Sequence, residues 1–381
     1  MTDLGAFLAE LQRLDIRLAL DGDRLRVDAP GSAITAELRA ELARRKPELV
    51  AHLRGPSAPA EGAAGGEPGP SPGQRRLWAL ATAKANGSAY HVPTAFRLKG
   101  PLDVSALEAA LADLERRHEP LRTTFRETGS TLASVVGDPR PFVLPIVDLG
   151  ARHAGGGALD EAILREIRDD VRAPFDLAVD RPWRARLLKA GADDHVLVLV
   201  MHHIAFDGRS KPIYLAELAE AYRARTAGRP PALAPLPARY SDFAVWQHAE
   251  ATAAEARGLA TWRARLRGVE ALELPRDRPR PDIASRGARS LAFELPLPLA
   301  KSLRAYARQE QSSPFAVLFA ALAALLHGRT GQEDIVVCAP FASRDRVAFE
   351  GLVGYLNTIV PPRVDATGDP AFHALVARVP S

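Results

Sequence analysis

The first fifty residues carry two patterns of apolar and polar positions. Near the N-terminus apolar residues recur three and four positions apart, the spacing of one helical face; they are Leu4, Phe7, Leu8, Leu11 and Leu14. From residue 16 to residue 27 apolar and polar residues alternate around Gly22 in a DGD turn, which is typical of a β-hairpin. Thr35 then precedes a helical pattern that contains Leu38 and Leu42, and Pro47 begins a last helical turn. We expect a small domain with the order helix, hairpin, helix, helix.

The rest of the chain alternates strand and helix patterns. TAFRLKG (94–100) and HVLVLVM (195–201) predict strands. Residues 103–118 predict an amphipathic helix with Leu107, Leu111 and Leu114 inward. SPFAVLFAALAALLHGRTG (313–331) predicts a long buried helix that ends at Gly328, and DIVVCAP (334–340) predicts a strand in which Cys338 is buried. This is a mixed α/β pattern, of the α+β kind.

Residues 55–70, GPSAPAEGAAGGEPGP, separate the head from the body. A segment of Gly, Pro, Ala, Ser and Glu buries too little apolar surface to offset its ordering entropy, so it predicts a flexible linker. The expected division is therefore a head at 1–54, the linker at 55–70, and a body beyond it.

Composition narrows the class of protein. The chain has 381 residues, 47% hydrophobic, which supports a large core and more than one domain. The net charge of +4 is spread among acids without interleaved aromatics, which disfavours a nucleic-acid groove. One cysteine excludes a disulfide framework. The sequence shows no glycine-rich nucleotide motif, signal-peptide pattern or membrane-length apolar run, so we expect a cytoplasmic protein.

Two adjacent histidines, His202 and His203, follow the buried strand pattern in VLVLVMHHIAFDGRS (196–210). Because a strand sends neighbouring side chains to opposite faces, the pair is poorly placed to share one ion with Asp207, and we expect no metal site. An imidazole titrates near neutral pH, so one histidine is a candidate for acid–base chemistry.

HHIAFDG (202–208) matches the HHxxxDG signature of the condensation domain superfamily of nonribosomal peptide synthetases, which folds like chloramphenicol acetyltransferase. Four further motifs occur in the order of that family: SPGQRRLW (71–78), RRHEPLRTTF (116–125), YSDFAVWQ (240–247) and VGYLNTIVPPR (353–363). The resemblance implies a V-shaped pair of lobes, here 71–250 and 251–381, around a tunnel.

The resemblance also implies a reaction. A carrier-bound acceptor amine attacks a carrier-bound donor thioester and an amide forms. Both substrates arrive on 4'-phosphopantetheine arms, and no cofactor is bound directly. His203 is the expected reacting group, as general base or as a group that holds the amine in line. The backbone N–H of Gly208 faces the developing oxyanion.

The remaining residues of the motifs have supporting roles under this resemblance. His202 supports the loop, and Asp207 fixes its shape through an arginine, because a buried carboxylate needs a partner. Arg344 is the first candidate for that arginine, with Arg122 and Arg289 as alternatives. Asn357 and Thr358 line the tunnel. We expect Trp78, Tyr240 and Trp246 to pack the core rather than to contact substrate.

The head resembles the TubC-type N-terminal docking domains of these synthetases, over LDIRLALDGDRLRVDAPGSAITAELRAELARRKPELVAHL (14–53). The resemblance implies a homodimer that captures a short C-terminal peptide of the upstream synthase. A hairpin leaves an edge to which an extended peptide can pair. Arg17, Arg24 and Arg26 lie on its outer face, where they either read acidic residues of that peptide or simply solvate the face.

Two departures from the family pattern keep other functions open. Arg209 follows Gly208, where tryptophan is common, and the sixth and seventh motifs do not follow the fifth, so we expect an incomplete second lobe. The alternatives are a non-catalytic docking or scaffold fragment, an epimerisation domain, or a stand-alone acyltransferase of the superfamily. A heterocyclisation domain is disfavoured, because such domains carry an aspartate in place of the histidine pair.

Overall fold

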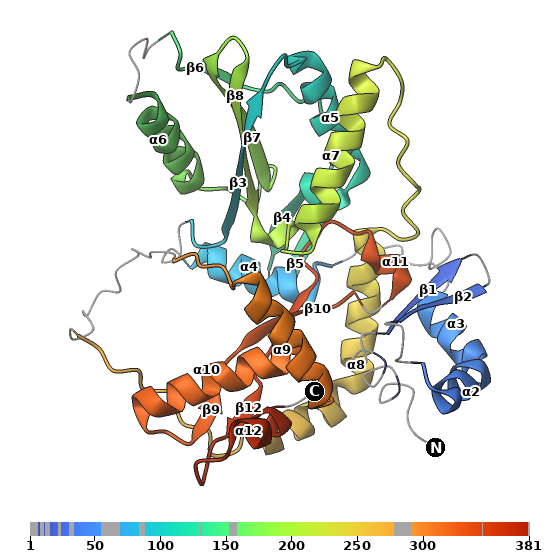
Figure 1. Ribbon diagram of the computed structural model, residues 1–381. Coiled ribbons are helices and arrows are strands. Elements are labelled where there is room, and N and C mark those ends of the chain that lie inside the picture. The colour runs from blue at the N-terminus through green and yellow to red at the C-terminus, as the bar shows by residue number, and fades with distance from the viewer. Residues whose placement is uncertain are drawn as a thin grey trace. The chain divides into compact units, whose positions relative to one another are not determined.

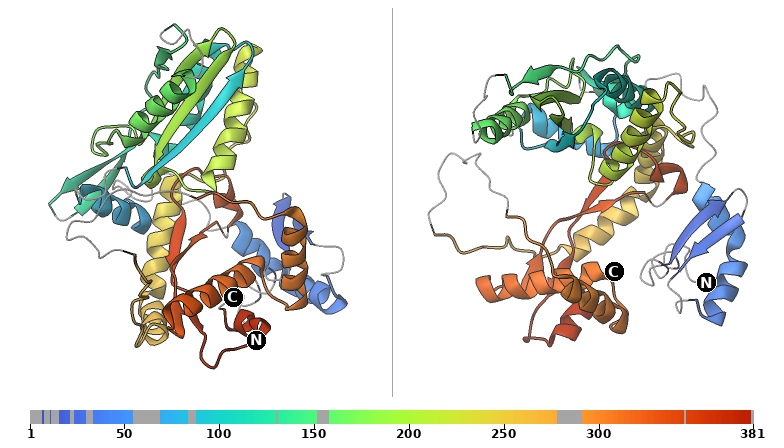
Figure 2. Two further views of the ribbon diagram at one scale, coloured as in Figure 1. Left: turned by 60° about the vertical axis from the view of Figure 1, so that its left-hand side comes forward. Right: turned by 45° about the horizontal axis from the view of Figure 1, so that its top comes forward.

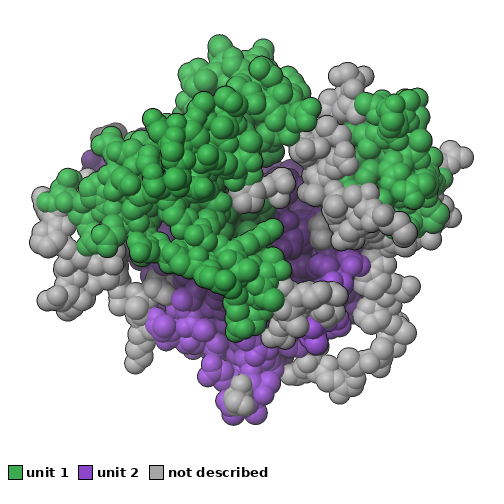
Figure 3. Space-filling view, turned by 90° about the horizontal axis from the view of Figure 1, so that it is seen from below, with its two compact units in different colours: residues 1–55, 254–341, 358–381 green, residues 56–253, 342–357 purple. Residues whose placement is uncertain are grey.

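The computed structural model describes residues 7, 11, 16–21, 24–29, 34–54, 69–83, 88–129, 131–151, 158–277, 291–344 and 346–379. The expectations for Leu4, Leu8, Leu14, Gly22 and Arg289 and for most of the linker fall outside these residues, as do the side chains of Arg17 and Arg24. The chain divides into two compact units (Figure 3): residues 1–55, 254–341 and 358–381 form unit 1, and residues 56–253 and 342–357 form unit 2. The expected mixture of helices and sheets is confirmed.

The head folds around a hairpin and two helices. Strands β1 (Arg17–Asp21) and β2 (Arg24–Asp28) are antiparallel, with Leu18 opposite Val27 and Ala19 opposite Arg26. Helix α2 (Ala36–Arg44) begins at Thr35, whose hydroxyl accepts from the N–H of Leu38 at 3.2 Å, and α3 (Lys46–Arg54) follows. The described apolar positions of these patterns meet in one core with Leu49 of α3; they are Phe7, Leu11, Ile16, Leu38 and Leu42.

The centre of unit 2 is a four-stranded sheet in the order β3-β8-β7-β6. Figure 2 shows the long strands β3 (His91–Lys99), β8 (Asp194–His202) and β7 (Trp183–Gly191) side by side. They are antiparallel, whereas the short edge strand β6 (Ile146–Asp148) is parallel to β7.

Helices cover both faces of this sheet, which explains why β8 is apolar at nearly every position. Helices α5 (Val104–Arg117) and α7 (Ser210–Thr226) cover one face and α6 (Ala158–Arg172) the other (Figure 1). Along β8, Leu197, Leu199 and Met201 pack in the core of α5 and α7. The alternate residues Val196, Val198 and Val200 pack in the core of α6. The side chains of β8 therefore alternate between the two faces of the sheet up to the end of the strand, and His202 continues this alternation.

Further elements of unit 2 surround the end of β8. Helix α4 (Pro72–Thr82) begins with a capping box between Ser71 and Gln74. The short helix η1 (Glu119–Arg122) leads into the hairpin of β4 (Thr123–Thr128) and β5 (Thr131–Val136). The first half of α8 (Tyr240–Arg265) packs with α11 (Val347–Glu350) through a cluster of Tyr240, Phe243, Phe349, Leu352 and Leu356. Segment 342–357 thus belongs to unit 2, although it lies far along the chain.

Unit 1 contains the helices α9 (Leu297–Gln309), α10 (Pro314–Thr330) and α12 (Phe372–Arg378) and the antiparallel pair β9 (Asp334–Val336) and β12 (Arg363–Asp365). Two further short strands, β10 (Ala339–Ala342) and β11 (Asn357–Val360), pair with each other. One core gathers residues of α10 and α12 with Ile335 and Val364.

Three expectations for unit 1 are wrong. Helix α10 continues past Gly328 to Thr330 and is capped by Gly331, whose φ of 71° is the left-handed conformation that glycine adopts freely at a helix end. The helix is buried on one side only, because Phe315, Leu318, Leu322 and Leu325 form one helical face that is exposed. The stretch 334–340 breaks into two strands, and Cys338 between them is exposed.

Membrane-span criteria of length and apolar composition are met by no single helix among the described residues, but they are met jointly by α9 and α10, which are bent by 102°.

Candidate active site

The last residue of β8, His202, is a buried and neutral histidine. Its side chain is 3% exposed, and Nδ1 accepts a hydrogen bond from the N–H of Ile204 at 3.1 Å. Its ring lies edge to face with those of His91 and Phe175. Burial, with smaller contributions from His91 and His203, lowers the pKa of His202 to about 3. Because Nδ1 accepts, the proton of the neutral ring is on Nε2.

His203 has the opposite arrangement. It opens the short helix η2 (His203–Ala205), and its backbone N–H donates to the carbonyl of Tyr90 at 2.8 Å. Ring atom Nδ1 lies 2.6 Å from the carbonyl oxygen of Phe206. Since a carbonyl only accepts, Nδ1 carries the proton and the lone pair is on Nε2. The half-buried ring therefore has a basic nitrogen with no hydrogen-bond partner among the described residues.

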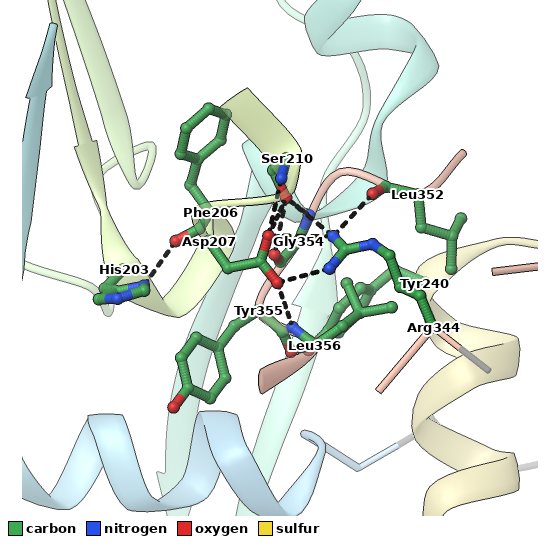
Figure 4. A network of polar contacts seen from close by, with 10 residues as sticks. All are labelled: His203, Phe206, Asp207, Ser210, Tyr240, Arg344, Leu352, Gly354, Tyr355 and Leu356. Atoms are coloured by element: carbon green, nitrogen blue, oxygen red, sulfur yellow. Dashed lines mark hydrogen bonds and ion pairs between the residues drawn. The ribbon is translucent and has the colours of Figure 1, made fainter. Parts of the chain in front are cut away.

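Asp207 lies close to His203 along the chain and belongs to a buried polar network (Figure 4). Its side chain is fully buried and accepts five hydrogen bonds. Arg344 donates from Nη1 to Oδ2 at 2.8 Å and from Nη2 to Oδ1 at 3.0 Å. Ser210 donates to Oδ1 from its backbone N–H (2.8 Å) and from its hydroxyl (2.7 Å). The N–H of Leu356 donates to Oδ2 at 3.1 Å.

The network holds Asp207 as a carboxylate. Burial would by itself raise the pKa of Asp207, but the hydrogen bonds and charge of Arg344, aided by Ser210 and Leu356, outweigh burial and lower the pKa. Arg344 is itself almost fully buried and also donates to the carbonyl of Leu352 at 3.0 Å. The pair therefore ties the loop after β8 to segment 342–357.

The structure distinguishes among the three candidate arginines. Arg344 lies against Asp207, whereas Arg122 donates to the carbonyl of Gly137 at 2.6 Å. Arg289 lies outside the described residues.

The other predicted site residues differ in their exposure. Gly208 is exposed, and a Cβ added to it would meet no atom within 4 Å, so its own surroundings do not require glycine. Asn357 and Thr358 begin β11; Asn357 is half-buried and Thr358 is exposed. Trp78 and Tyr240 are buried, and the ring of Trp246 packs against that of Phe349, as core residues do.

Tyr355 is a site residue that the sequence reasoning missed. Its ring stands nearly perpendicular to the ring of His203, with centroids 5.2 Å apart. Arg76 of α4 donates to the Tyr355 hydroxyl at 2.7 Å, and the Tyr240 hydroxyl donates to its carbonyl at 2.7 Å. A Cβ at Gly73 would lie 2.6 Å from the Tyr355 ring, so glycine is needed there. The position of Tyr355 inside the VGYLNTIVPPR motif was the available signal.

The described residues hold no group of three or more His, Cys, Asp or Glu side chains that is arranged to hold a metal ion.

Comparison with known proteins defines the class. Residues 70–381 match the family model of the condensation domain, and residues 5–55 match that of the TubC N-terminal docking domain. The X-domain from teicoplanin biosynthesis superimposes with a TM-score of 0.72 at 32% identity, over 83% of this chain and 69% of that one. The first condensation domain of the CDA synthetase gives 0.67 at 22% identity, over 83% and 74%, which supports the fold alone. The class is a condensation domain with a chloramphenicol-acetyltransferase-like fold, preceded along the chain by a docking domain.

The chain belongs to the condensation domain family of nonribosomal peptide synthetases. It is 41% identical over 330 residues to the probable synthetase CymA of Salinispora arenicola. The aligned region covers 82% of this chain and 4% of CymA. It is 39% identical over 311 residues to the cyclosporin synthetase of Tolypocladium inflatum. That aligned region covers 81% of this chain and 2% of the synthetase. The chain thus spans a small part of these relatives.

Proposed function

We propose that this chain forms an amide bond between a carrier-bound donor thioester and the amine of a carrier-bound acceptor. The observation that carries the proposal is the tautomer of His203. Its Nδ1–H is bound to the carbonyl of Phe206, which leaves a basic Nε2 on a half-buried ring. An α-amine must lose a proton as it attacks, and a neutral imidazole near pH 7 accepts one.

The proposed step balances without a cofactor. The amine nitrogen of the acceptor forms the C–N bond at the donor carbonyl carbon, and the C–S bond of the thioester breaks. The amine proton passes to Nε2 of His203 and from there to the departing thiolate. The backbone N–H of Gly208 supports the oxyanion, for which the open space beside Gly208 leaves room. Asn357 and Thr358 line the path of the arms.

The residues around His203 act on its position. Asp207 and Arg344 fix the loop that carries His203, and Tyr355 packs on its ring. His202 is buried and neutral, and its Nδ1 already accepts from the backbone, so it stabilises the turn and does not exchange protons with substrate. These are positioning residues, because the contacts described for them are with the loop, with the backbone or with the ring of His203.

The assay is single-turnover condensation in the full natural polypeptide. Donor and acceptor carrier proteins are loaded with acyl and aminoacyl phosphopantetheine, and mass spectrometry follows the acceptor carrier. The proposal expects the acceptor to gain the mass of the donor acyl group. Carriers that bind without any mass transfer would instead favour the non-catalytic scaffold, and inversion of the acceptor α-carbon without transfer would favour an epimerisation domain.

The head is proposed to recruit the C-terminal tail of an upstream synthase, with carrier proteins as the partners of the body. The hairpin β1–β2 is a sheet of two strands only, and Leu18, Leu25 and Val27 use one face for the core. Arg26 is exposed on the other face, opposite Ala19. An acidic extended peptide fits beside this hairpin, where the sequence predicts that Arg17 and Arg24 join Arg26 in reading it.

Calorimetry of the full chain with synthetic tails of upstream synthases tests the docking proposal. We expect saturable binding that weakens as salt rises, because exposed charges are screened. Arg26→Glu is expected to weaken binding, whereas Arg39→Glu, on the exposed side of α2, carries the same charge change and is the matched control. Binding that is insensitive to salt and to Arg26→Glu would contradict the arginine role.

A further inference from the structure

Unit 2 contains a cavity of about 260 Å³ that the proposed reaction does not use. Its walls come from the end of α5, from η1, from the hairpin β4–β5 with the link after it, and from the segment before β7. Four arginines line it, which are Arg122, Arg126, Arg140 and Arg181. The two carboxylates in its lining are Glu115 and Asp138, so positive charge exceeds negative charge.

Two of the four arginines present their side chains to solvent. Arg126 and Arg140 are exposed, and neither has an ion-pair partner among the described residues. Arg122 spends one N–H on the carbonyl of Gly137, and its buried Nε has no hydrogen-bond partner among the residues described. Guanidinium groups from η1, from β4 and from the link after β5 thus line one small cavity, and the buried Nε–H of Arg122 is the one among them that lacks a partner among the described residues.

Glu115 is a second, independent observation that the wall of the cavity contains buried polar groups. Its side chain is 2% exposed, and neither carboxylate oxygen makes a well-aligned hydrogen bond among the described residues. The Nε atom of Arg181 lies 3.0 Å from Oε1. Burial raises the pKa of Glu115, against the opposing charges of Arg181 and Arg122 and the smaller effects of the backbone N–H and the charge of Arg140. A buried carboxylate with unfilled acceptor sites is costly, and it accounts for only part of the arginine charge.

We infer that this cavity binds a phosphate group, as the free anion or as a small phosphate monoester. Arginine N–H groups that come from several directions suit the tetrahedral oxygens of a dianion better than the planar oxygens of a single carboxylate. Arg126 and Arg140 hold the anion at the mouth, Arg122 contributes its unused N–H groups from the wall, and Arg181 stays with Glu115. The Glu115 charge weakens the site that the arginines form.

Isothermal calorimetry of the whole chain with inorganic phosphate at pH 7.5 and about 0.15 M salt, where weak surface attraction is screened, tests this inference. We expect saturable binding. Arg126→Ala and Arg140→Ala are each expected to weaken it about tenfold, the effect of losing one charge-assisted hydrogen bond. Arg97→Ala removes the same charge from an exposed arginine of β3, paired with Asp160 and Asp194, and is expected to leave affinity unchanged.

Glu115→Gln gives the sharpest reading, since it removes the opposing charge while keeping shape. It is expected to tighten phosphate binding several-fold, with folding checked by circular dichroism. A parallel titration with methyl phosphate separates the two sources: equal affinity assigns the site to monoesters, and weaker affinity assigns it to the free anion. Heat that does not saturate, equal losses in all three arginine variants, or weaker binding in Glu115→Gln would overturn the inference.

Discussion

Asp207→Asn removes one charge from the buried network and leaves its shape intact. Oδ1 of Asp207 receives N–H and O–H groups from Arg344 and Ser210, and Oδ2 receives N–H groups from Arg344 and Leu356. In either orientation of the new side chain, its NH₂ group faces at least two hydrogen-bond donors, and an amide NH₂ cannot accept a hydrogen bond from them. The cation of Arg344, 3% exposed, also loses its counter-charge.

These losses set the expected cost. Breaking a buried ion pair by removing one partner costs about 3–5 kcal/mol, because the remaining charge stays desolvated. We expect a loss of that size in the free energy of unfolding of unit 2. Asp194→Asn is the matched control, since Asp194 pairs with Arg97 and Lys99 at the surface. Exposed pairs contribute at most about 1 kcal/mol.

Urea unfolding followed by tryptophan fluorescence measures both variants, because Trp78, Trp183 and Trp246 all belong to unit 2. Arg344→Gln and the double variant complete a thermodynamic cycle, in which the double variant should cost less than the sum of the single ones. A loss below about 1 kcal/mol for Asp207→Asn at unchanged m-value, equal to that of the Asp194 control, would refute the network as the support of the loop.

Two further predictions concern the surroundings of His203. The pKa of His202 in the folded chain, about 3, lies below the unfolded value of 6.5, so His202 favours folding fully above pH 6.5 and less as pH falls toward 3. Below pH 6.5 the free energy of unfolding should fall with a slope that approaches about 1.4 kcal/mol per pH unit. Thermal melts between pH 7.5 and 5.5 should show a shallower slope in His202→Asn, whose side-chain carbonyl still accepts from the N–H of Ile204. An unchanged slope would count against a buried neutral His202. Gly73→Ala places a Cβ 2.6 Å from the Tyr355 ring and is expected to destabilise unit 2 by about 1–3 kcal/mol. Tyr355→Leu should relieve the clash in the double variant. Additive losses of the two substitutions in urea unfolding would contradict the contact between Gly73 and Tyr355.

Local patterns in the sequence predict much of the fold. The alternation in β8 and the capped helices α2 and α5 follow from side-chain periodicity and hydrogen bonding within a few residues. The length of α10 was misjudged because Gly328 is compatible with a helix, whereas the left-handed turn that ends the helix is at Gly331. Its exposed face could not be predicted, because an all-round apolar helix gives no sign of which face lacks a partner.

The site was partly predictable for the same reason. The residues of one motif are local, so the separation of His202 from His203 follows from strand geometry and the turn after it. Arg344 lies 137 positions from Asp207, and only the need of a buried carboxylate for a cation pointed to it. Tyr355 reaches His203 through a contact between elements distant in sequence, which no periodicity encodes.

The central claim is that Nε2 of His203, and no atom of His202, accepts the proton of the acceptor amine. The direct measurement is the single-turnover rate of amide formation between loaded carriers for His203→Ala and His202→Asn in the full natural polypeptide. Since general base catalysis contributes about 10²–10⁴-fold, His203→Ala should lose at least a hundredfold in rate while His202→Asn stays within about tenfold of wild type. Wild-type turnover in His203→Ala would contradict the account.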